Sequence, residues 1–591
     1  MSGAPANFNA VWARTVAQEL ARGGVRSVAI APGSRSAPLA FAIAAEPSLR
    51  AHVVIDERSA AFLALGAAKA SGRPAAVLAT SGSAGGHFLP AALEAEASGV
   101  PLVLLTADRP PELHGFGAPQ TLDQQALFGG HVRLFADLGP PEPTDAALLH
   151  LRAVVSLAVS RAQGLRPGPV HINAPFREPL APIAQTLPAG LSLRALEGDP
   201  SAPSLAHLVS VVSPAPGALD AVAAELARHP RGVIVCGPRD RADELPKHAA
   251  ALSAATGYPI LAEAASNLRQ ALPRAIATYD TLLRHQVVAA ALRPDAVIRL
   301  GGGLTSKVLQ GWLDTAGAYT VLVTEGGRVA DPSHAGSIVL DGDASITCEA
   351  LARRLPQGPP AAPLAAPFAA ADATVRATFE SAFSSAGDVS ITEPRLAREV
   401  AAALPDDGLL FVSSSMPIRD LDAFATSLPA RSRVLANRGL NGIDGIVSTA
   451  LGASLGAGLR TVALLGDVAL LHDLSGLVAA RRLAAPLVLV VPNNDGGGIF
   501  HFLPVAAHAD PASFETLFGT PHGIDLASVA SLAGAQLHRP RSAAELRAVV
   551  REASGSGLHL VEVRTERRAN VAAHRALQGA ALAGLEGRSW A

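Results

Sequence analysis

The sequence predicts an α/β protein of three consecutive doubly wound domains with mainly parallel sheets. Short apolar, β-rich runs alternate with alanine-rich helical stretches along most of the chain, and two Pro-rich stretches interrupt this alternation. Strands that alternate with helices in this way form parallel sheets that are covered on both faces. A chain of 591 residues is long enough for three such domains, each with its own core.

The three predicted domains cover residues 1–185, 215–357 and 388–591. In the first, strands are expected within VRSVAIAPGS, AHVVIDERS, AAVLATSGS and PLVLLTADRP. In the second, they are expected within RGVIVCGPRD, YPILAEAAS, DAVIRLGGG and AYTVLVTEGG. In the third, they are expected within GLLFVSSS, RVLANRG, TVALLGD, LVLVVPNN and HLVEVRT. Pro- and Leu-rich sequence at 178–215 and a Pro/Ala-rich stretch at 355–373 separate the domains.

Composition excludes several classes of function. Charged residues make up 17% of the chain, hydrophobic residues 49%, and the formal net charge is −2, so no nucleic-acid or membrane partner is indicated. Cys236 and Cys348 lie far apart in the sequence, and we expect buried free thiols rather than a disulfide framework or a zinc site. The chain has neither an apolar run near the ~18 residues of a membrane span nor a signal-peptide core. We expect a cytoplasmic enzyme.

Two apolar strands of the third domain end in oxygen-bearing side chains. TVALLGD places Gly466 and Asp467 after one strand, and LVLVVPNNDGGG places Asn494 and Gly496 after the other. Open α/β sheets hold phosphorylated ligands at this end of their strands. A carboxylate, an amide carbonyl and a main-chain carbonyl, together with diphosphate oxygens, would complete an octahedral Mg²⁺ shell. Two ordinary strand-end turns are the alternative, but the spacing and the glycine-rich tail favour the metal site.

This pair of strand ends resembles the diphosphate and Mg²⁺ motif of thiamine-diphosphate enzymes. Thiamine chemistry also needs a carboxyl group that hydrogen-bonds N1′ of the cofactor's pyrimidine. Glu57, where a strand ends and an alanine-rich helix begins, is the candidate. Such a residue is often only a helix cap, but Asp56 suits the cap position better. Because Glu57 and Asp467 lie in different domains, the resemblance implies a homodimer or homotetramer with sites at the subunit interface.

Longer segments in all three domains closely resemble the 2-succinyl-5-enolpyruvyl-6-hydroxy-3-cyclohexene-1-carboxylate synthases of menaquinone biosynthesis, a family of thiamine-diphosphate carboligases. These segments are APGSRSAPLAFA, TSGSAGGHFLPAALEA, TADRPPELHGFGAPQT, LTSKVL, SSSMPIRDLD, NRGLNGIDGIVSTALG, GDVALLHDL and NNDGGGIFHFLP. The resemblance implies thiamine diphosphate and Mg²⁺ (or Mn²⁺) as cofactors. It also implies that 2-oxoglutarate is decarboxylated and that the resulting carbanion adds in conjugate fashion to isochorismate.

The same resemblance assigns roles to individual residues. Both substrates are dianions, which planar guanidinium groups bind well. A lone arginine is usually a solvated charge, but four of them in predicted loops favour an anion pocket. The catalytic candidates are Glu57, Ser415, Arg419 and Arg438. The substrate-binding candidates are Ser34, Arg35, Arg109, Gln120, Lys307, Ser415, Arg419, Arg438, Phe500 and Leu503. The cofactor-binding candidates are Glu57, Ser81, Gly82, Ser415, Met416, Ile443, Gly466, Asp467, Asn494, Gly496, Ile499 and Phe500, with Asp467, Asn494 and Gly496 holding the metal.

Three other interpretations stay open on the residues alone. Another thiamine-diphosphate decarboxylase or carboligase, such as an acetolactate-synthase-like enzyme, would share the metal motif but would not need so many pocket arginines. A nicotinamide-dependent dehydrogenase would share the strand–helix rhythm, although no glycine fingerprint followed by an acidic residue occurs in the first domain. A catalytically inactive homologue is disfavoured because Glu57, Asp467 and Asn494 occur together.

Overall fold

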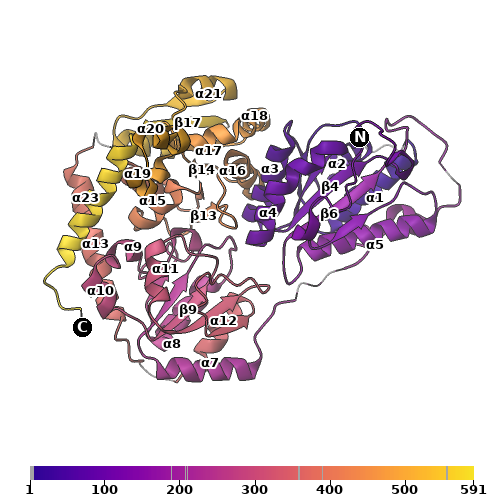
Figure 1. Cartoon of the computed structure of the whole chain (residues 1–591). Helices are drawn as coiled ribbons and strands as arrows, with labels where there is room; N and C mark the ends of the chain where they lie inside the picture. Colours follow the sequence, from indigo (N-terminus) through magenta and orange to yellow (C-terminus); the bar gives the residue numbers. More distant parts are fainter. Residues whose placement is uncertain are drawn as a thin grey trace. The chain divides into compact units, whose positions relative to one another are not determined.

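The chain folds into three parallel β-sheets with helices packed on them (Figure 1). The structure, a computed structural model, describes residues 6–187, 189–206, 208, 210–356, 360–388, 391–553 and 557–590. Within these residues, every pair of neighbouring strands in the three sheets is parallel. The predicted α/β class with parallel sheets is confirmed.

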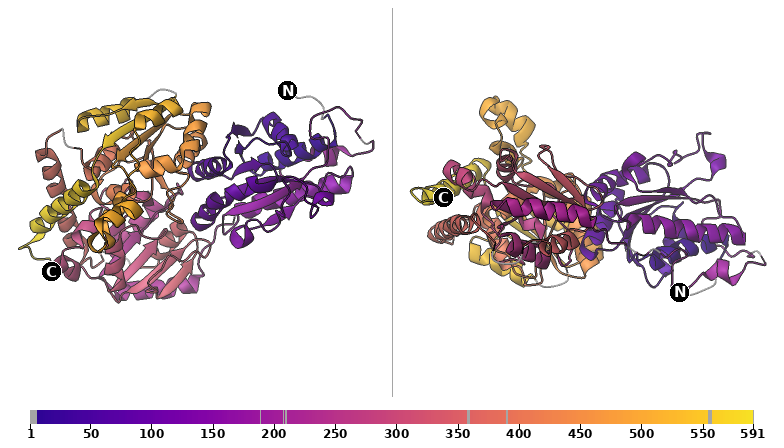
Figure 2. Two further views of the ribbon diagram at one scale, coloured as in Figure 1. Left: turned by 45° about the horizontal axis from the view of Figure 1, so that its top comes forward. Right: turned by 90° about the horizontal axis from the view of Figure 1, so that it is seen from below.

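The first sheet has the strand order β2-β1-β3-β4-β6-β5. Its strands are β1 (Ser27–Ile30), β2 (Arg50–Val53), β3 (Ala75–Ala79), β4 (Leu102–Asp108), β5 (Phe135–Asp137) and β6 (Pro169–Pro175). Its helices are α1 (Phe8–Arg22), α2 (Ala37–Ala45), α3 (Glu57–Ser71), α4 (Leu89–Ser98) and α5 (Asp145–Ala162). Helices α1, α2 and α5 pack on one face of this sheet, and α3 and α4 pack on the other (Figures 1 and 2).

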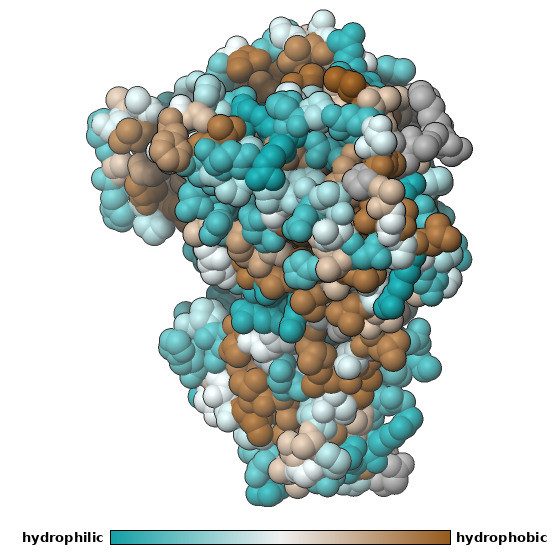
Figure 3. Space-filling model, turned by 90° about the vertical axis from the view of Figure 1, so that its right-hand side faces the viewer, coloured by the Kyte–Doolittle hydropathy of each residue, from teal (hydrophilic) through white to brown (hydrophobic). Residues whose placement is uncertain are grey.

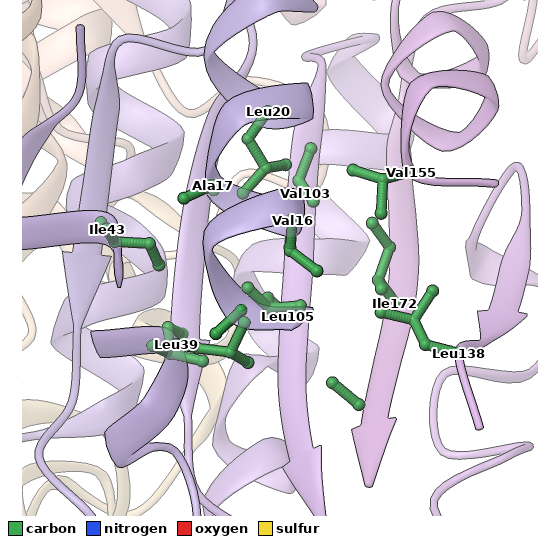
Figure 4. Close-up of a cluster of buried hydrophobic side chains, with 14 of the residues drawn as sticks. Val16, Ala17, Leu20, Leu39, Ile43, Val103, Leu105, Leu138, Val155 and Ile172 are labelled. Carbon is green, nitrogen blue, oxygen red and sulfur yellow. The ribbon is translucent and has the colours of Figure 1, made fainter. Parts of the chain in front are cut away.

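Aliphatic side chains form the core between this sheet and helices α1, α2 and α5. Figure 4 shows Val16 and Leu20 of α1 close to Val103 and Leu105 of β4. Residues two apart in a strand point to the same face, which is why Val103 and Leu105 both enter this core. All four side chains are inaccessible to solvent. The apolar runs of the sequence therefore become strands that are buried on both faces, as parallel sheets require.

The second sheet has the order β11-β10-β9-β7-β8. Its strands are β7 (Gly232–Cys236), β8 (Ile260–Ala262), β9 (Ala296–Leu300), β10 (Tyr319–Thr324) and β11 (Ile338–Asp341). Helices in this part of the chain include α7 (Pro216–Arg228), α8 (Leu245–Thr256), α11 (Lys307–Asp314) and α12 (Ala344–Ala352). The long helix α13 (Ala365–Ser385) leads towards the third sheet.

The third sheet has the order β13-β12-β14-β15-β17-β16. Its strands are β12 (Leu409–Val412), β13 (Arg433–Ala436), β14 (Thr461–Leu464), β15 (Leu487–Asn493), β16 (Gln536–His538) and β17 (Leu558–Arg564). Its helices include α14 (Glu393–Ala403), α15 (Met416–Phe424), α16 (Ile446–Ala457), α17 (Asp467–His472), α18 (Leu474–Leu483), α21 (Leu526–Ala533), α22 (Ala543–Glu552) and α23 (Arg567–Leu585). Numbered along the chain from its own first strand, this order is the same as that of the first sheet.

The chain forms two compact units. The first comprises the described residues of Met1–Ser210, Gly445–Gly458 and Asp473–Ala485. The second comprises those of Val211–Asp444, Leu459–His472 and Pro486–Ala591. Helices α16 and α18, which belong to the third domain by sequence, are therefore part of the first unit, where α16 packs along α3.

Glycines allow the backbones of α3 and α16 to approach closely. A Cβ added at Gly452 of α16 would lie 1.9 Å from the main-chain oxygen of Leu63 in α3. In the other direction, a Cβ at Gly66 of α3 would lie 1.9 Å from the main-chain oxygen of Thr449. No side chain fits in either place, so the alanine-rich, glycine-containing sequence of these helices specifies the contact between them.

Replacing Gly452 with alanine is expected to force α3 and α16 apart and to destabilise the protein by about 1–3 kcal/mol, as overpacking of a core does. Gly579→Ala in α23 is the matched control, because the added Cβ there meets no atom within 4 Å. The control is expected to raise stability by about 0.5–1 kcal/mol, the usual advantage of alanine over glycine in a helix. Midpoints of thermal unfolding compare the two variants, and equal midpoints would contradict this account of the contact.

Both cysteines are free, buried thiols, as predicted. Burial raises the pKa of Cys236 to about 12. Within the described residues, no helix combines the length and the apolar character that are needed to cross a membrane.

Candidate active site

The predicted site residues follow corresponding strands of the first and third sheets. In both sheets the chain runs from the first strand to an edge strand and then returns to the other side of the first strand. That reversal is the topological switch point at which open α/β sheets bind ligands. In the first unit, residues of the predicted site follow β1 (Ser34, Arg35), β2 (Glu57), β3 (Ser81, Gly82) and β4 (Arg109, Gln120). In the second unit they follow β12 (Ser415, Met416, Arg419), β13 (Arg438, Ile443), β14 (Gly466, Asp467) and β15 (Asn494, Gly496, Ile499, Phe500, Leu503).

Arg35 and Arg109 lie close enough in the first unit to interact electrostatically. The Arg35 side chain is buried, and its Nη1 donates a hydrogen bond to the main-chain oxygen of Phe176 at 2.8 Å. Its Nη2 lies 3.2 Å from the carboxylate of Glu178. Burial lowers the pKa of the Arg35 guanidinium, and the positive charge of Arg109 lowers this pKa further. Two guanidinium groups that repel each other in this way form a place where an anion would be stabilised.

The loops that follow β3 and β4 also meet. Gly82 has φ of 83°, and its N–H donates to the side-chain oxygen of Gln124 at 3.1 Å. A Cβ at Gly82 would lie 3.2 Å from Cα of Gln120, which itself has a left-handed φ of 53°. Ser81 is buried beside them. The structure therefore brings Ser81, Gly82 and Gln120 together in a strained, closely packed pair of turns.

Glu57 is the first residue of α3, and Asp56 is the N-cap of that helix. Oδ1 of Asp56 accepts a hydrogen bond from the Ser59 N–H at 2.8 Å. The prediction that Asp56, and not Glu57, caps the helix is confirmed. The half-buried Glu57 side chain is thus not needed for capping.

The metal-ligand candidates converge in the second unit. Strands β14 and β15 are neighbours, and Oδ2 of Asp467 accepts a hydrogen bond from the Gly496 N–H at 3.0 Å. The Asp467 side chain is only 2% exposed, and burial raises its pKa although hydrogen bonds from Gly496 and Val468 act in the opposite direction. A buried carboxylate of this kind is normally paired with a cation.

The orientation of the Asn494 amide fits a metal site. Its Nδ2 donates to Oε1 of Glu393 at 2.9 Å. Its Oδ1 is buried and accepts no hydrogen bond from any described residue. Buried carbonyl oxygens nearly always have a partner, and a hard divalent cation is a suitable partner for this one. The described residues contain no cluster of three or more His, Cys, Asp or Glu side chains that could hold a metal. The candidate ligands Asp467, Asn494 and Gly496 include only one such side chain, so the proposed site does not depend on a cluster of this kind.

Ser415 and Arg419 form a strained turn after β12. Ser415, the N-cap of α15, has φ of 75°, a costly value for a residue other than glycine, and such strain is frequent at functional sites. Nη1 of Arg419 donates to the main-chain oxygen of Ser415 at 2.5 Å. Met416, the first residue of α15, is buried.

Both Arg419 and Arg438 interact electrostatically with Glu263, so the two predicted arginines lie near the same carboxylate. Burial and the neighbouring Asp422 raise the pKa of Glu263.

Apolar candidates lie beside the metal-ligand loop. The turn Gly498–Phe502 carries Ile499 and Phe500, and the Phe500 ring is 5.4 Å from that of Phe518. Leu503, the next residue, is 37% exposed. Ile443 is half-buried in the connection between β13 and α16. Lys307 is exposed at the first position of α11, which follows β9 of the second sheet.

Sequence reasoning missed a group of polar residues behind the metal-ligand candidates. Glu393, buried at 3% exposure, accepts hydrogen bonds from Asn494, Thr565 and Asn570. Burial and the charge of Asp420 raise the pKa of Glu393 to about 7, while the hydrogen bonds from Asn494 and Thr565 lower it. Nε2 of His522 lies 3.2 Å from Oδ2 of Asp467. Glu393 is 101 residues from Asn494 and 177 from Asn570, and a lone glutamate before a proline signals only a helix start, so no local pattern could have found it.

Comparison with known proteins identifies relatives along the whole chain. Three family descriptions match: "Thiamine pyrophosphate enzyme, N-terminal TPP binding domain" over residues 12–127, "Middle domain of thiamine pyrophosphate" over 215–412, and "Thiamine pyrophosphate enzyme, C-terminal TPP binding domain" over 423–563. Thiamine pyrophosphate is another name for thiamine diphosphate.

Several similar proteins are named 2-succinyl-5-enolpyruvyl-6-hydroxy-3-cyclohexene-1-carboxylate synthase. The protein of that name from Myxococcus xanthus is 55% identical over 99% of each chain. The protein from Thermobifida fusca is 44% identical over 98% of this chain and 100% of its own length. The protein from Geobacillus kaustophilus is 40% identical over 96% of this chain and 97% of its own length.

Proposed function

The chain belongs to the 2-succinyl-5-enolpyruvyl-6-hydroxy-3-cyclohexene-1-carboxylate synthase family of thiamine-diphosphate enzymes, and we propose that it decarboxylates 2-oxoglutarate and adds the resulting four-carbon unit to isochorismate in menaquinone biosynthesis. The observation that carries this proposal is the full-length similarity to proteins of that name, 55% identity in one case. Bound thiamine diphosphate supplies the nucleophilic carbon and the electron sink that the decarboxylation needs.

We propose that Asp467, Asn494 and the main-chain carbonyl of Gly496 hold the Mg²⁺ or Mn²⁺ that binds the cofactor's diphosphate. The buried Oδ1 of Asn494 and the buried carboxylate of Asp467 support this assignment, because both are hard oxygen donors that need a cation. Gly466 has open space beside its Cα, which suits a close approach of a phosphate group to the backbone.

At the other end of the cofactor, we assign Glu57 to N1′ of the pyrimidine. Its position at the first turn of α3, with the cap supplied by Asp56, supports this role. Ser81 and Gly82 would approach the same ring through close backbone contact, which small residues permit. Ile443, Ile499 and Phe500, together with Met416, would enclose the cofactor and exclude water. In this assignment the domain of residues 1–185 holds the pyrimidine and the domain of residues 388–591 holds the diphosphate, with a central domain at 215–357.

The arginines supply positive charge for two dianionic substrates. Ser415, Arg419 and Arg438 would bind the carboxylates of 2-oxoglutarate, a role supported by the strained turn that holds Ser415 and Arg419 together. Arg35, Arg109, Ser34, Gln120 and Lys307 would bind isochorismate, with Phe500 and Leu503 as apolar walls. The mutual repulsion of Arg35 and Arg109 supports the isochorismate site, since a bound carboxylate would relieve it.

We infer that the active protein is a homodimer or homotetramer in which one subunit presents Glu57 and another presents the metal site. Large apolar side chains remain exposed in the segments that follow β1, β2 and β4 of the first unit, namely Phe41, Ile55 and Phe116. Figure 3 shows that hydrophobic residues are exposed among hydrophilic ones on one face of the molecule. Burial of such side chains against a second copy would stabilise the assembly.

A coupled assay tests the proposed function. Purified protein with thiamine diphosphate and Mg²⁺ is expected to release CO₂ from 2-oxoglutarate and to consume isochorismate only when 2-oxoglutarate is also present. Omission of the metal is expected to remove both activities, and pyruvate serves as the matched small 2-oxo acid. Faster release of CO₂ from pyruvate than from 2-oxoglutarate would contradict the proposed substrate and would favour an acetolactate-synthase-like activity.

A further inference from the structure

We propose that Glu393 is a positioning residue that turns the Asn494 amide so that its oxygen, and not its nitrogen, faces the metal. The inference rests on the proposed role of Asn494 as a metal ligand. An asparagine side chain has nearly the same shape with its amide turned by 180°, yet only one of the two orientations offers an oxygen to a cation. Some neighbouring group must therefore select the orientation.

Glu393 is placed to make that selection. It is the first residue of α14, and its carboxylate contacts the loop that carries Asn494. Its Oε1 accepts hydrogen bonds from Nδ2 of Asn494 at 2.9 Å and from Oγ1 of Thr565 at 2.8 Å. Its Oε2 accepts from Nδ2 of Asn570, in α23, at 2.8 Å. Three donors from three different segments thus hold the buried carboxylate in one position.

The chemistry of the pair leaves one consistent arrangement. Both carboxyl oxygens of Glu393 accept hydrogen bonds, Oε1 from Asn494 and Thr565 and Oε2 from Asn570, so the group that Asn494 turns towards Glu393 is its NH₂. The amide oxygen then points away from Glu393, where it is buried and accepts no hydrogen bond from the described residues. Asp467, the other side-chain ligand candidate, lies close to this loop, since its carboxylate accepts a hydrogen bond from the N–H of Gly496, two residues after Asn494.

Glu393 does not act as a helix cap. An acidic residue at the start of a helix often accepts hydrogen bonds from the free main-chain N–H groups of the first turn. The hydrogen bonds of Glu393 in the described structure go instead to three side chains outside α14. A residue that served only to begin the helix would not need these partners.

The test is equilibrium binding of Mn²⁺ to the full-length protein with thiamine diphosphate, measured from the electron paramagnetic resonance signal of free Mn²⁺. Glu393→Gln introduces an NH₂ group that can donate to the Asn494 oxygen and so favours the turned amide. It is expected to raise the Kd for Mn²⁺ by about 10- to 100-fold, the usual effect of replacing a group that orients a metal ligand. Glu393→Asp keeps the negative charge but moves it away from Asn494, so it is also expected to raise the Kd for Mn²⁺. This variant replaces Glu393→Gln in the test if Glu393→Gln does not fold.

Two further variants separate positioning from general stability. Glu399→Gln is the matched control, because Glu399 is equally buried in α14 but pairs with arginines, among them Arg398. It is expected to lower the midpoint of thermal unfolding with little change in the Kd for Mn²⁺. In the double variant Glu393→Gln/Asn494→Asp, the second side chain offers oxygen in either orientation, so Mn²⁺ affinity is expected to recover towards that of the wild type.

The outcomes distinguish this inference from the proposed metal site itself. If Asn494→Ala weakens Mn²⁺ binding and Glu393→Gln leaves it within about threefold of the wild type, the role of Glu393 is wrong and the metal site stands. If Asn494→Ala also binds Mn²⁺ as the wild type does, the metal lies elsewhere and both proposals fail. Loss of affinity in Glu393→Gln without recovery in the double variant would likewise contradict selection of the amide orientation.

Discussion

Asp467→Ala is expected to reduce CO₂ release from 2-oxoglutarate by at least about 10³-fold, because a metal ion at such a site contributes several kcal/mol to catalysis. The variant would lose the one carboxylate among the proposed ligands. In the absence of cofactor its unfolding midpoint is expected to fall slightly, since the hydrogen bonds that the Asp467 carboxylate accepts from the N–H groups of Gly496 and Val468 are lost. Addition of Mg²⁺ and thiamine diphosphate would raise the unfolding midpoint of the wild type but not that of the variant.

The control for this variant is Asp473→Asn. Asp473 is also a buried aspartate close to Asp467 in sequence, but its carboxylate accepts hydrogen bonds from Ser59 and Ser448 within the first unit. Its replacement is expected to lower the unfolding midpoint while Mg²⁺ and thiamine diphosphate still stabilise the protein. A cofactor-induced rise of wild-type size in Asp467→Ala would contradict the proposed metal site.

Glu57→Gln is expected to lower the rate of CO₂ release by about 10²- to 10⁴-fold, the range that general acid–base groups contribute. Glutamine preserves the size of the side chain but cannot share a proton with N1′ of the pyrimidine. The variant should still bind thiamine diphosphate, because the metal site is untouched. The exchange of the cofactor's C2 proton for deuterium, followed by nuclear magnetic resonance, should slow by a similar factor.

Asp56→Asn is the matched control for Glu57→Gln. Asparagine is as good a helix cap as aspartate, so α3 should begin at the same residue. We expect activity and C2 proton exchange close to those of the wild type. Undiminished activity in Glu57→Gln would contradict the role of Glu57 at the pyrimidine. An equal loss in Asp56→Asn would show that the negative charge of this turn matters for a reason other than the pyrimidine.

Much of the fold was predictable because the sequence repeats one local pattern. Apolar runs such as TVALLGD and LVLVVPNN are too short for helices and end in polar turns. Both the parallel strands and the choice of metal-ligand candidates at their ends could therefore be predicted from the sequence. Asp467 and Gly496 do meet at that edge of the sheet, joined by a hydrogen bond. The cap at Asp56 was also predictable, since it depends on residues adjacent in sequence.

Other features depend on contacts between distant segments and leave no local pattern. Helix α16 packs on α3 through Gly452, although the two helices lie far apart in the sequence. Glu393 reaches Asn494 across 101 residues and Asn570 across 177. Only the folded chain brings these partners together, which is why neither the helix contact nor the role of Glu393 was expected.

A crystal structure of the protein with thiamine diphosphate and Mg²⁺ tests the central claim most directly. The account predicts one cofactor whose N1′ lies within hydrogen-bonding distance of the Glu57 carboxyl group and whose diphosphate shares its metal with Asp467 and Asn494. It also predicts that this Glu57 comes from a different subunit than the two metal ligands. A metal bound without Asp467 and Asn494, or a Glu57 side chain remote from every bound cofactor, would contradict the account.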